Sequence, residues 1–222
     1  MDFRGPEPAD FRNVHAMNQA FLQRMRDSMS GRELRQQMVR PVSPMIRGLT
    51  DLQIERLSAT PFLLLSLRER DEDYWSFLTN DDSTGDLLIA ADIGFESSQL
   101  AAASLAFLWQ LARRNPYAAR LVSGATLNWC EQLAECTLFR LLQRTVRRGD
   151  LLRPRRPDDA EFWHKLLGPG LSSEQEVRRA ARLSALQSIL TEDPVTRYRA
   201  VRAAACNTPV PSLRVAEKRD RP

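Results

Sequence analysis

The sequence predicts an all-α protein, an irregular multi-helix bundle that includes a helix-turn-helix-like hairpin. Three observations favour this class. Apolar residues recur at helical spacing along most of the 222-residue chain, capping residues and prolines stand where helices would begin, and the apolar-polar alternation of half-buried strands is nearly absent. With 43% apolar residues, the chain can bury a core of ordinary size.

The N-terminal helical region is expected to span residues 1–78. Its first helix has an apolar face formed by Phe11, Val14, Phe21, Leu22, Met25 and Met29. Ser30-Gly31 ends that helix, and Ser30 begins a short second one, which Pro41 and Pro44 stop. No internal repeat is apparent in the chain.

Two further helices are expected to start in the same region. Thr50 and Gln53 have capping-box spacing, and Thr60-Pro61 supplies a cap and a first-turn proline ahead of the apolar run 62–67. This run predicts a buried helix, with a strand as the alternative, because so few apolar residues do not define a period. A short helix is expected at 74–78.

An acidic connection at 79–96 is the preferred domain boundary. Between Arg68 and Glu96 the sequence has nine carboxylates and two arginines, which is typical of a solvated segment. The C-terminal helical region is expected at 97–206, and whether it shares a core with the first region stays open. The tail, residues 207–222, contains three prolines and many charges and is expected to be disordered.

The hairpin lies inside the C-terminal region. Residues 116–122 form a short helix, Ser123-Gly124-Ala125 a tight turn, and Thr126 opens a long helix towards Arg148, which is the spacing of a helix-turn-helix. After an arginine-proline linker, Asp158 with Glu161 caps a short helix, and Ser173 and Pro194 begin two more.

Arginine dominates the positive charge, with thirty arginines against two lysines. Codon bias would explain an arginine excess that runs through the whole chain. A binding role would explain a local concentration of arginine, because the planar guanidinium group can donate two hydrogen bonds to one phosphate. Residues 140–156 contain seven arginines and one carboxylate. The predicted nucleic-acid-binding residues are Arg140, Arg144, Arg147, Arg148, Arg153, Arg155 and Arg156.

Catalytic and metal sites are not predicted. Glu161 and His164 share a helix face, but a di-iron site needs a second such pair, and no nucleophile elbow or glycine-rich phosphate loop occurs. Cys130, Cys136 and Cys206 have no metal-ligand spacing, so they are expected to be reduced, and no cofactor is expected. Without a signal peptide or an uninterrupted apolar span, the expected location is cytoplasmic, with no membrane contact.

Residues 105–152 resemble the flagellar transcriptional regulator FlhD family. The match runs through Leu111-Ala112-Arg113, Gly124, Leu133-Ala134, Thr137-Leu138 and Leu141. The resemblance implies an all-α cytoplasmic regulator that binds promoter DNA together with a protein partner. Departures include Phe139-Arg140 in place of Pro-Gln, Leu152 in place of a cysteine, and a chain nearly twice as long.

The sequence therefore predicts a non-catalytic, DNA-associated transcriptional regulatory protein that binds double-stranded DNA as a homo-oligomer or beside a protein partner. The alternative is an α-helical interaction adaptor for secretion or assembly that does not bind nucleic acid. In that case the first helix and the 62–67 segment would dock a protein.

Overall fold

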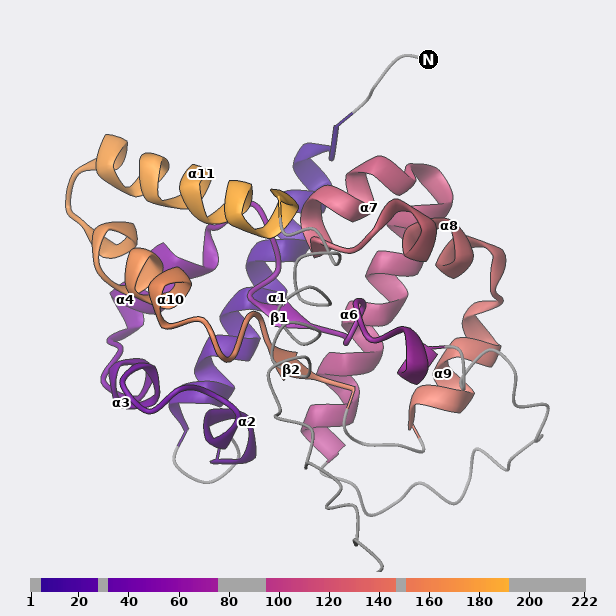
Figure 1. Cartoon of the computed structure of the whole chain (residues 1–222), viewed down its shortest axis with the longest axis horizontal. Helices are drawn as coiled ribbons and strands as arrows, with labels where there is room; N and C mark the ends of the chain where they lie inside the picture. The colour runs from indigo at the N-terminus through magenta and orange to yellow at the C-terminus, as the bar shows by residue number, and fades with distance from the viewer. Residues whose placement is uncertain (1–4, 28–31, 76–94, 147–150, 192–222) are drawn as a thin grey trace, which may run out of the picture. The chain divides into compact units, whose positions relative to one another are not determined.

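The computed structural model describes residues 5–27, 32–75, 95–146 and 151–191, and the part described is mostly helical, as predicted (Figure 1). The helices are α1 (Pro8–Arg26), α2 (Arg32–Gln36), α3 (Val42–Arg47), α4 (Asp51–Ser58), α6 (Phe95–Arg114), α7 (Pro116–Ser123), α8 (Leu127–Glu135), α9 (Leu138–Val146), α10 (Ala160–Leu167) and α11 (Gln175–Thr191), with a 3-10 turn, η2, at Pro169–Leu171. One antiparallel pair joins β1 (Leu65–Ser66) to β2 (Arg153–Pro154). Most of the acidic connection, and the helix and tail predicted beyond residue 191, lie outside the described residues.

The apolar run at 62–67 is not helical, so the predicted helix there is wrong, and the strand alternative is correct for Leu65–Ser66 alone, which forms β1. Partners far away in the sequence satisfy its main chain. The Leu63 N–H donates to Val122 O at 3.0 Å, and the Leu64 carbonyl accepts from Arg155 N at 2.8 Å. These long-range hydrogen bonds take the place of the hydrogen bonds within a helix. A buried main-chain group needs a hydrogen-bond partner, but that partner can lie far away in the sequence.

The long helix predicted from Thr126 towards Arg148 is two helices, α8 and α9. Cys136 breaks it with an extended backbone (φ −72°, ψ 153°), and its carbonyl accepts from the Trp109 ring N–H at 2.8 Å. Thr137 then caps the new helix, since its hydroxyl accepts from Arg140 N at 3.3 Å. Elsewhere the capping box at Thr50 is confirmed, while α10 is capped by Asp159 rather than Asp158.

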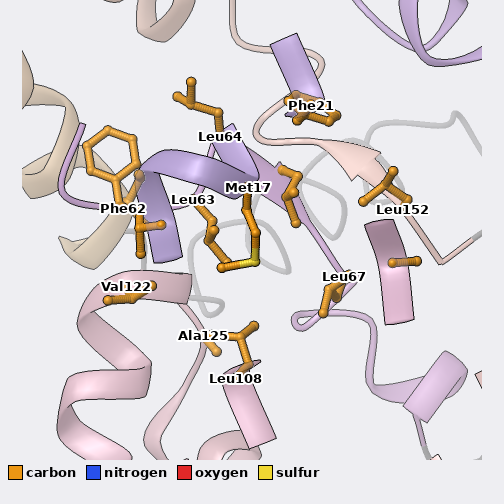
Figure 2. Close-up of a cluster of buried hydrophobic side chains, with 14 of the residues drawn as sticks. Met17, Phe21, Phe62, Leu63, Leu64, Leu67, Leu108, Val122, Ala125 and Leu152 are labelled. Carbon is orange, nitrogen blue, oxygen red and sulfur yellow. The ribbon is translucent and has the colours of Figure 1, made fainter. Parts of the chain in front are cut away.

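The two predicted helical regions share one core. The described residues up to Leu190 belong to one compact unit, and the buried apolar side chains form a continuous cluster. Figure 2 shows part of it, where α1, the 62–67 segment, α6, α7 and the chain before β2 meet at Met17, Phe21, Phe62, Leu63, Leu64, Leu67, Leu108, Val122, Ala125 and Leu152. The boundary predicted in the acidic connection therefore does not separate two cores.

A structural repeat, not apparent in the sequence, runs through this core. The series α1, α2, α3, α4, β1 is followed by the series α6, α7, α8, α9, β2. The capping threonines of α4 and α9, Thr50 and Thr137, are 87 positions apart and each accepts from the N–H three residues on, at 3.3 Å. The long first helices of the two series, α1 and α6, bury many equivalent positions, although the buried Leu22 and Leu111 have half-buried equivalents, Trp109 and Arg24. The buried pairs are Val14 and Ala101, Met17 and Ser104, Asn18 and Leu105, Phe21 and Leu108, and Met25 and Ala112.

The segments that follow β1 and β2, residues 67–75 and 155–163, are called the return segments here, and they repeat in more detail, now 88 positions apart. Arg68 (φ 57°) and Arg156 (φ 46°) are the non-glycine residues with positive φ in the described part of the chain. Each pairs with the aspartate three residues later, Arg68 with Asp71 at 2.5 Å and Arg156 with Asp159 at 2.8 Å. Each also lies over the aromatic ring six residues later, at 4.2 Å from the Tyr74 centroid and 5.6 Å from the Phe162 centroid.

The strand pair relates the two series to each other. Leu65 faces Pro154, and Ser66 faces Arg153. Pro154 is the equivalent of Ser66 and Arg153 that of Leu65, so the equivalent strands of the two series pair with each other in the antiparallel direction. The chain thus contains two similar series of elements, repeat 1 (8–75) and repeat 2 (95–163), which meet at the antiparallel β1–β2 pair.

Candidate interaction site

The arginines predicted to bind DNA do not form one exposed group. Arg140 is exposed in the first turn of α9. The side chain of Arg144, and the whole of Arg147 and Arg148, lie outside the described residues. The remaining three, after the helix, belong to the framework of the fold.

Arg155 is buried, with 5% of its surface exposed. Its guanidinium pairs with the buried Glu69 and donates to two main-chain carbonyls, Leu63 O at 3.1 Å and Leu65 O at 2.6 Å. Its own carbonyl accepts from the Trp163 ring N–H at 2.8 Å. The prediction that Arg155 contacts phosphate is wrong, because an internal carboxylate already neutralises a side chain that solvent does not reach.

Arg156 is also engaged internally. Besides its ion pair with Asp159, it donates to Ser188 O at 3.0 Å, which ties the return segment of repeat 2 to α11. Its half-buried position does not present a free cation to a duplex, so its predicted role as a phosphate contact is corrected as well.

Arg153 is half-buried in β2, close to the carboxylate of Asp71. Although burial of Asp71 acts to raise its pKa, the net shift is downward. The Arg68 side chain and the Tyr74 N–H donate hydrogen bonds to this carboxylate, and the charges of Arg68 and Arg153 favour its ionised form. The charge of Arg153 therefore has an internal counterpart.

The same use of arginine recurs across the fold. Guanidinium groups donate to main-chain carbonyls at helix ends and loops, which a planar fork with several N–H groups does better than an ammonium. The bonds run from Arg26 to Leu49, Arg35 to Met25 and Asp27, Arg56 to Leu171, Arg70 to Gly124 and Ile189, Arg178 to Ser172 and Ser173, and Arg182 to Arg56. This is a structural reason for arginine in place of lysine, in addition to codon bias and binding.

The predicted hairpin is present, with α7 and α8 joined by a turn in which Gly124 has a left-handed backbone (φ 66°). A β-carbon there would meet the Ile189 side chain at 2.0 Å, so the position requires glycine. However, the helix after the turn presents two carboxylates, Glu131 and Glu135, and no arginine. As a recognition helix it would repel phosphate.

Other chemically active side chains do not converge. Within the described residues, no group of three or more His, Cys, Asp or Glu side chains lies close enough together to hold a metal ion. His164 is exposed, and Glu161 pairs with Lys165 at 2.8 Å. Burial raises the pKa of Cys130 to about 12, which keeps this thiol protonated and a poor nucleophile at neutral pH. Cys206 lies outside the described residues.

The candidate site is instead a pair of exposed apolar side chains. Leu52 on α4 and Phe139 on α9 are 60% and 63% exposed, the highest fractions among the large exposed hydrophobic side chains of the described residues. Each follows its capping threonine by two positions, so they occupy the same place in the two repeats. Leu183 on α11, at 55%, belongs to neither repeat.

The docking elements of the adaptor alternative are mostly buried. Phe62, Leu63, Leu64, Leu65 and Leu67 are fully buried, and on α1 the side chains of Val14, Phe21, Leu22 and Met25 lie in the core, whereas Phe11 is 37% exposed. The sequence contains one signal for the exposed pair, the matching Thr-x-(Leu/Phe) positions 87 residues apart, but this signal is too short to recognise without the structure.

No family model, curated protein or solved structure matches this chain. The resemblance to the FlhD family therefore stays a prediction. Among the described helices, none combines the length and the apolar character needed to cross a bilayer.

Proposed function

We propose that this chain is a non-catalytic interaction protein that binds a protein partner through the first turns of α4 and α9. The observation that carries the proposal is the equivalent exposure of Leu52 and Phe139. One exposed leucine would be ordinary. Two large apolar side chains exposed to the same extent at the same place in two repeats favour a shared role.

The local structure suits docking. Threonine caps fix the first turn of both helices, so little conformational freedom would be lost when a partner binds there. Burying one such side chain contributes about 1.5–3 kcal/mol. Arg140, next to Phe139, adds the residue type that interface hot spots favour along with aromatic side chains.

Partner capture from the cells that make this protein tests the proposal. Captures with the wild type, with Leu52→Ser/Phe139→Ser and with Leu183→Ser should be compared by quantitative mass spectrometry. We expect a partner that the double variant loses and that Leu183→Ser, which removes a similarly exposed leucine from α11, retains. The same proteins at the same levels in all three captures would contradict the proposal.

A DNA-associated transcriptional regulator acting in the cytoplasm is the second candidate. Arg140 is exposed, Arg144, Arg147 and Arg148 follow it without an intervening carboxylate, and the resemblance to the FlhD family points the same way. Such a protein would bind double-stranded DNA in an oligomer or with its partner. Arg153, Arg155 and Arg156 would have no part in the contact.

Fluorescence anisotropy on duplex DNA tests this candidate. Changing Arg140, Arg144, Arg147 and Arg148 to Ala should weaken binding and lower the log-log salt slope by about 0.9 for each phosphate that the variant no longer neutralises. The matched control changes four exposed arginines elsewhere, Arg12, Arg40, Arg47 and Arg179. A flat salt response, or equal losses of affinity in both variants, would reject the regulator.

A further inference from the structure

Three half-buried arginines meet where the end of α4 lies against the chain that leads into α11. Arg56, in the last turn of α4, donates to Leu171 O at 3.2 Å. Arg182 donates to the carbonyl of Arg56 itself at 2.6 Å. Arg178 donates to both carbonyls of residues 172–173, at 2.8 Å and 2.7 Å. These contacts place the three side chains around one short segment, and they are called the arginine cluster below.

The arginine cluster has no internal counter-charge. Within the part of the chain that the structure describes, none of its guanidinium groups forms an ion pair with a carboxylate, and their hydrogen bonds go to neutral carbonyls. The framework arginines differ, since Arg155 pairs with Glu69 and Arg156 with Asp159. The cluster therefore concentrates positive charge that the fold itself does not neutralise.

The carboxylates closest to the cluster in the chain are paired elsewhere or exposed. Glu55, next to Arg56, pairs with His15 at 3.3 Å. Glu174 and Glu176, at the start of α11, are exposed and form no ion pair with the cluster. Because water and salt screen exposed charges, these two carboxylates offset the field of the cluster only in part.

Arg182 experiences the lack of a counter-charge most directly. Burial and the positive charge of Arg178 both lower the pKa of Arg182, and no carboxylate acts in the opposite direction. Its Nε atom is buried and has no hydrogen-bond partner among the described residues. A partly desolvated cation beside a second cation is unfavourable unless an anion offsets the repulsion. An anion held between the two guanidinium groups would do so.

We propose that the arginine cluster binds a small phosphate-bearing anion between α4 and α11. Each guanidinium has several N–H groups, and the bonds to main-chain carbonyls use only part of them. The others can form charge-assisted hydrogen bonds to phosphate oxygens, whose geometry the planar guanidinium matches. Three cations favour a phosphate dianion over a carboxylate, which carries less negative charge. This site is separate from Leu52 and Phe139 and adds a ligand class to the interaction function.

Titration of inorganic phosphate into the isotope-labelled protein, at constant ionic strength and followed by the NMR signals of arginine Nε–H groups, tests the proposal. We expect saturable shifts of the signals of Arg56, Arg178 and Arg182. Arg178→Gln and Arg182→Gln should each raise the dissociation constant for phosphate about tenfold or more, since each removes charge-assisted bonds. Arg179→Gln, an exposed arginine on the same helix, is the matched control and should bind phosphate like the wild type.

Two further probes identify the ligand chemistry. Tighter binding of O-phosphoserine than of inorganic phosphate would indicate a phosphate monoester, and the reverse order would indicate the free anion. Acetate that binds as tightly as phosphate would overturn the proposal. So would the absence of a saturable shift, or equal phosphate affinity in the wild type and both glutamine variants.

Circular dichroism verifies that the variants are folded. Arg178→Gln decides the outcome if Arg182→Gln does not fold, because the carbonyls that accept from Arg178 lie in the loop before α11 and not in the core. An Arg178→Gln variant that is folded and keeps the affinity of the wild type for phosphate would contradict the proposal by itself.

Discussion

Replacing Arg155 with alanine should lower the free energy of unfolding by about 3–5 kcal/mol. The substitution leaves Glu69, itself buried, without its counter-charge and removes the donor to Leu63 O and Leu65 O. An uncompensated buried charge is among the costliest defects in a folded protein. Urea unfolding followed by circular dichroism measures the change.

Two controls make this result specific. Arg140→Ala removes an exposed arginine from the same basic stretch and should change stability by less than about 0.5 kcal/mol. Arg155→Lys keeps the charge but not the planar fork, so it should recover only part of the loss. If Arg155→Ala were as stable as Arg140→Ala, Arg155 would not be part of the framework.

Asn18→Ala should cost about 2–4 kcal/mol, the second largest effect we expect. The buried Asn18 amide donates to Phe62 O at 2.9 Å and to Thr60 Oγ1 at 3.1 Å, and its oxygen accepts from Leu64 N at 2.7 Å. Alanine leaves the Leu64 N–H without this partner and opens a cavity between α1 and the 62–67 segment.

The same urea titration measures the effect of Asn18→Ala. Gln23→Ala, an exposed polar residue on the same helix, should be nearly neutral. A loss for Asn18→Ala no greater than that for Gln23→Ala would mean that the amide does not hold the 62–67 segment in place.

Local signals in the sequence predicted local structure well. The capping box at Thr50, the cap at Thr126 and the left-handed turn at Gly124 follow from residue types within a few positions, and all three are present. The all-α class follows from many such signals together. The break at Cys136 was missed, because the apolar pattern continues across it, although the next residue, Thr137, is of a type that caps helices.

Features that depend on distant partners were not predictable in the same way. Arg155 stands in a run of arginines and prolines, and only the fold brings Glu69, 86 positions earlier, against it. The non-helical path of residues 62–67 likewise depends on Asn18 and Val122.

The repeat escaped detection because identical residues at equivalent positions, such as Arg68 and Arg156, are few and scattered, while most equivalent core positions share burial rather than residue identity. Met17 corresponds to Ser104, and Asn18 to Leu105, pairs that no comparison of residue types would match. The exposed pair Leu52 and Phe139 has meaning only once the repeat is known. The candidate site could therefore be found only from the structure.

The two repeats fold as one unit, because they share a core and the β1–β2 pair. Equilibrium urea unfolding of the wild type, followed both by tryptophan fluorescence and by far-ultraviolet circular dichroism, tests directly whether the two repeats unfold together. Trp75 of repeat 1 packs against Trp129 of repeat 2 with ring centroids 5.3 Å apart, and Trp109 and Trp163 lie in or against the core of repeat 2, so fluorescence reports on the junction and on repeat 2. We predict a single transition with coincident midpoints. Two separate transitions, with fluorescence changing before half of the helical signal is lost, would show instead that the repeats unfold independently.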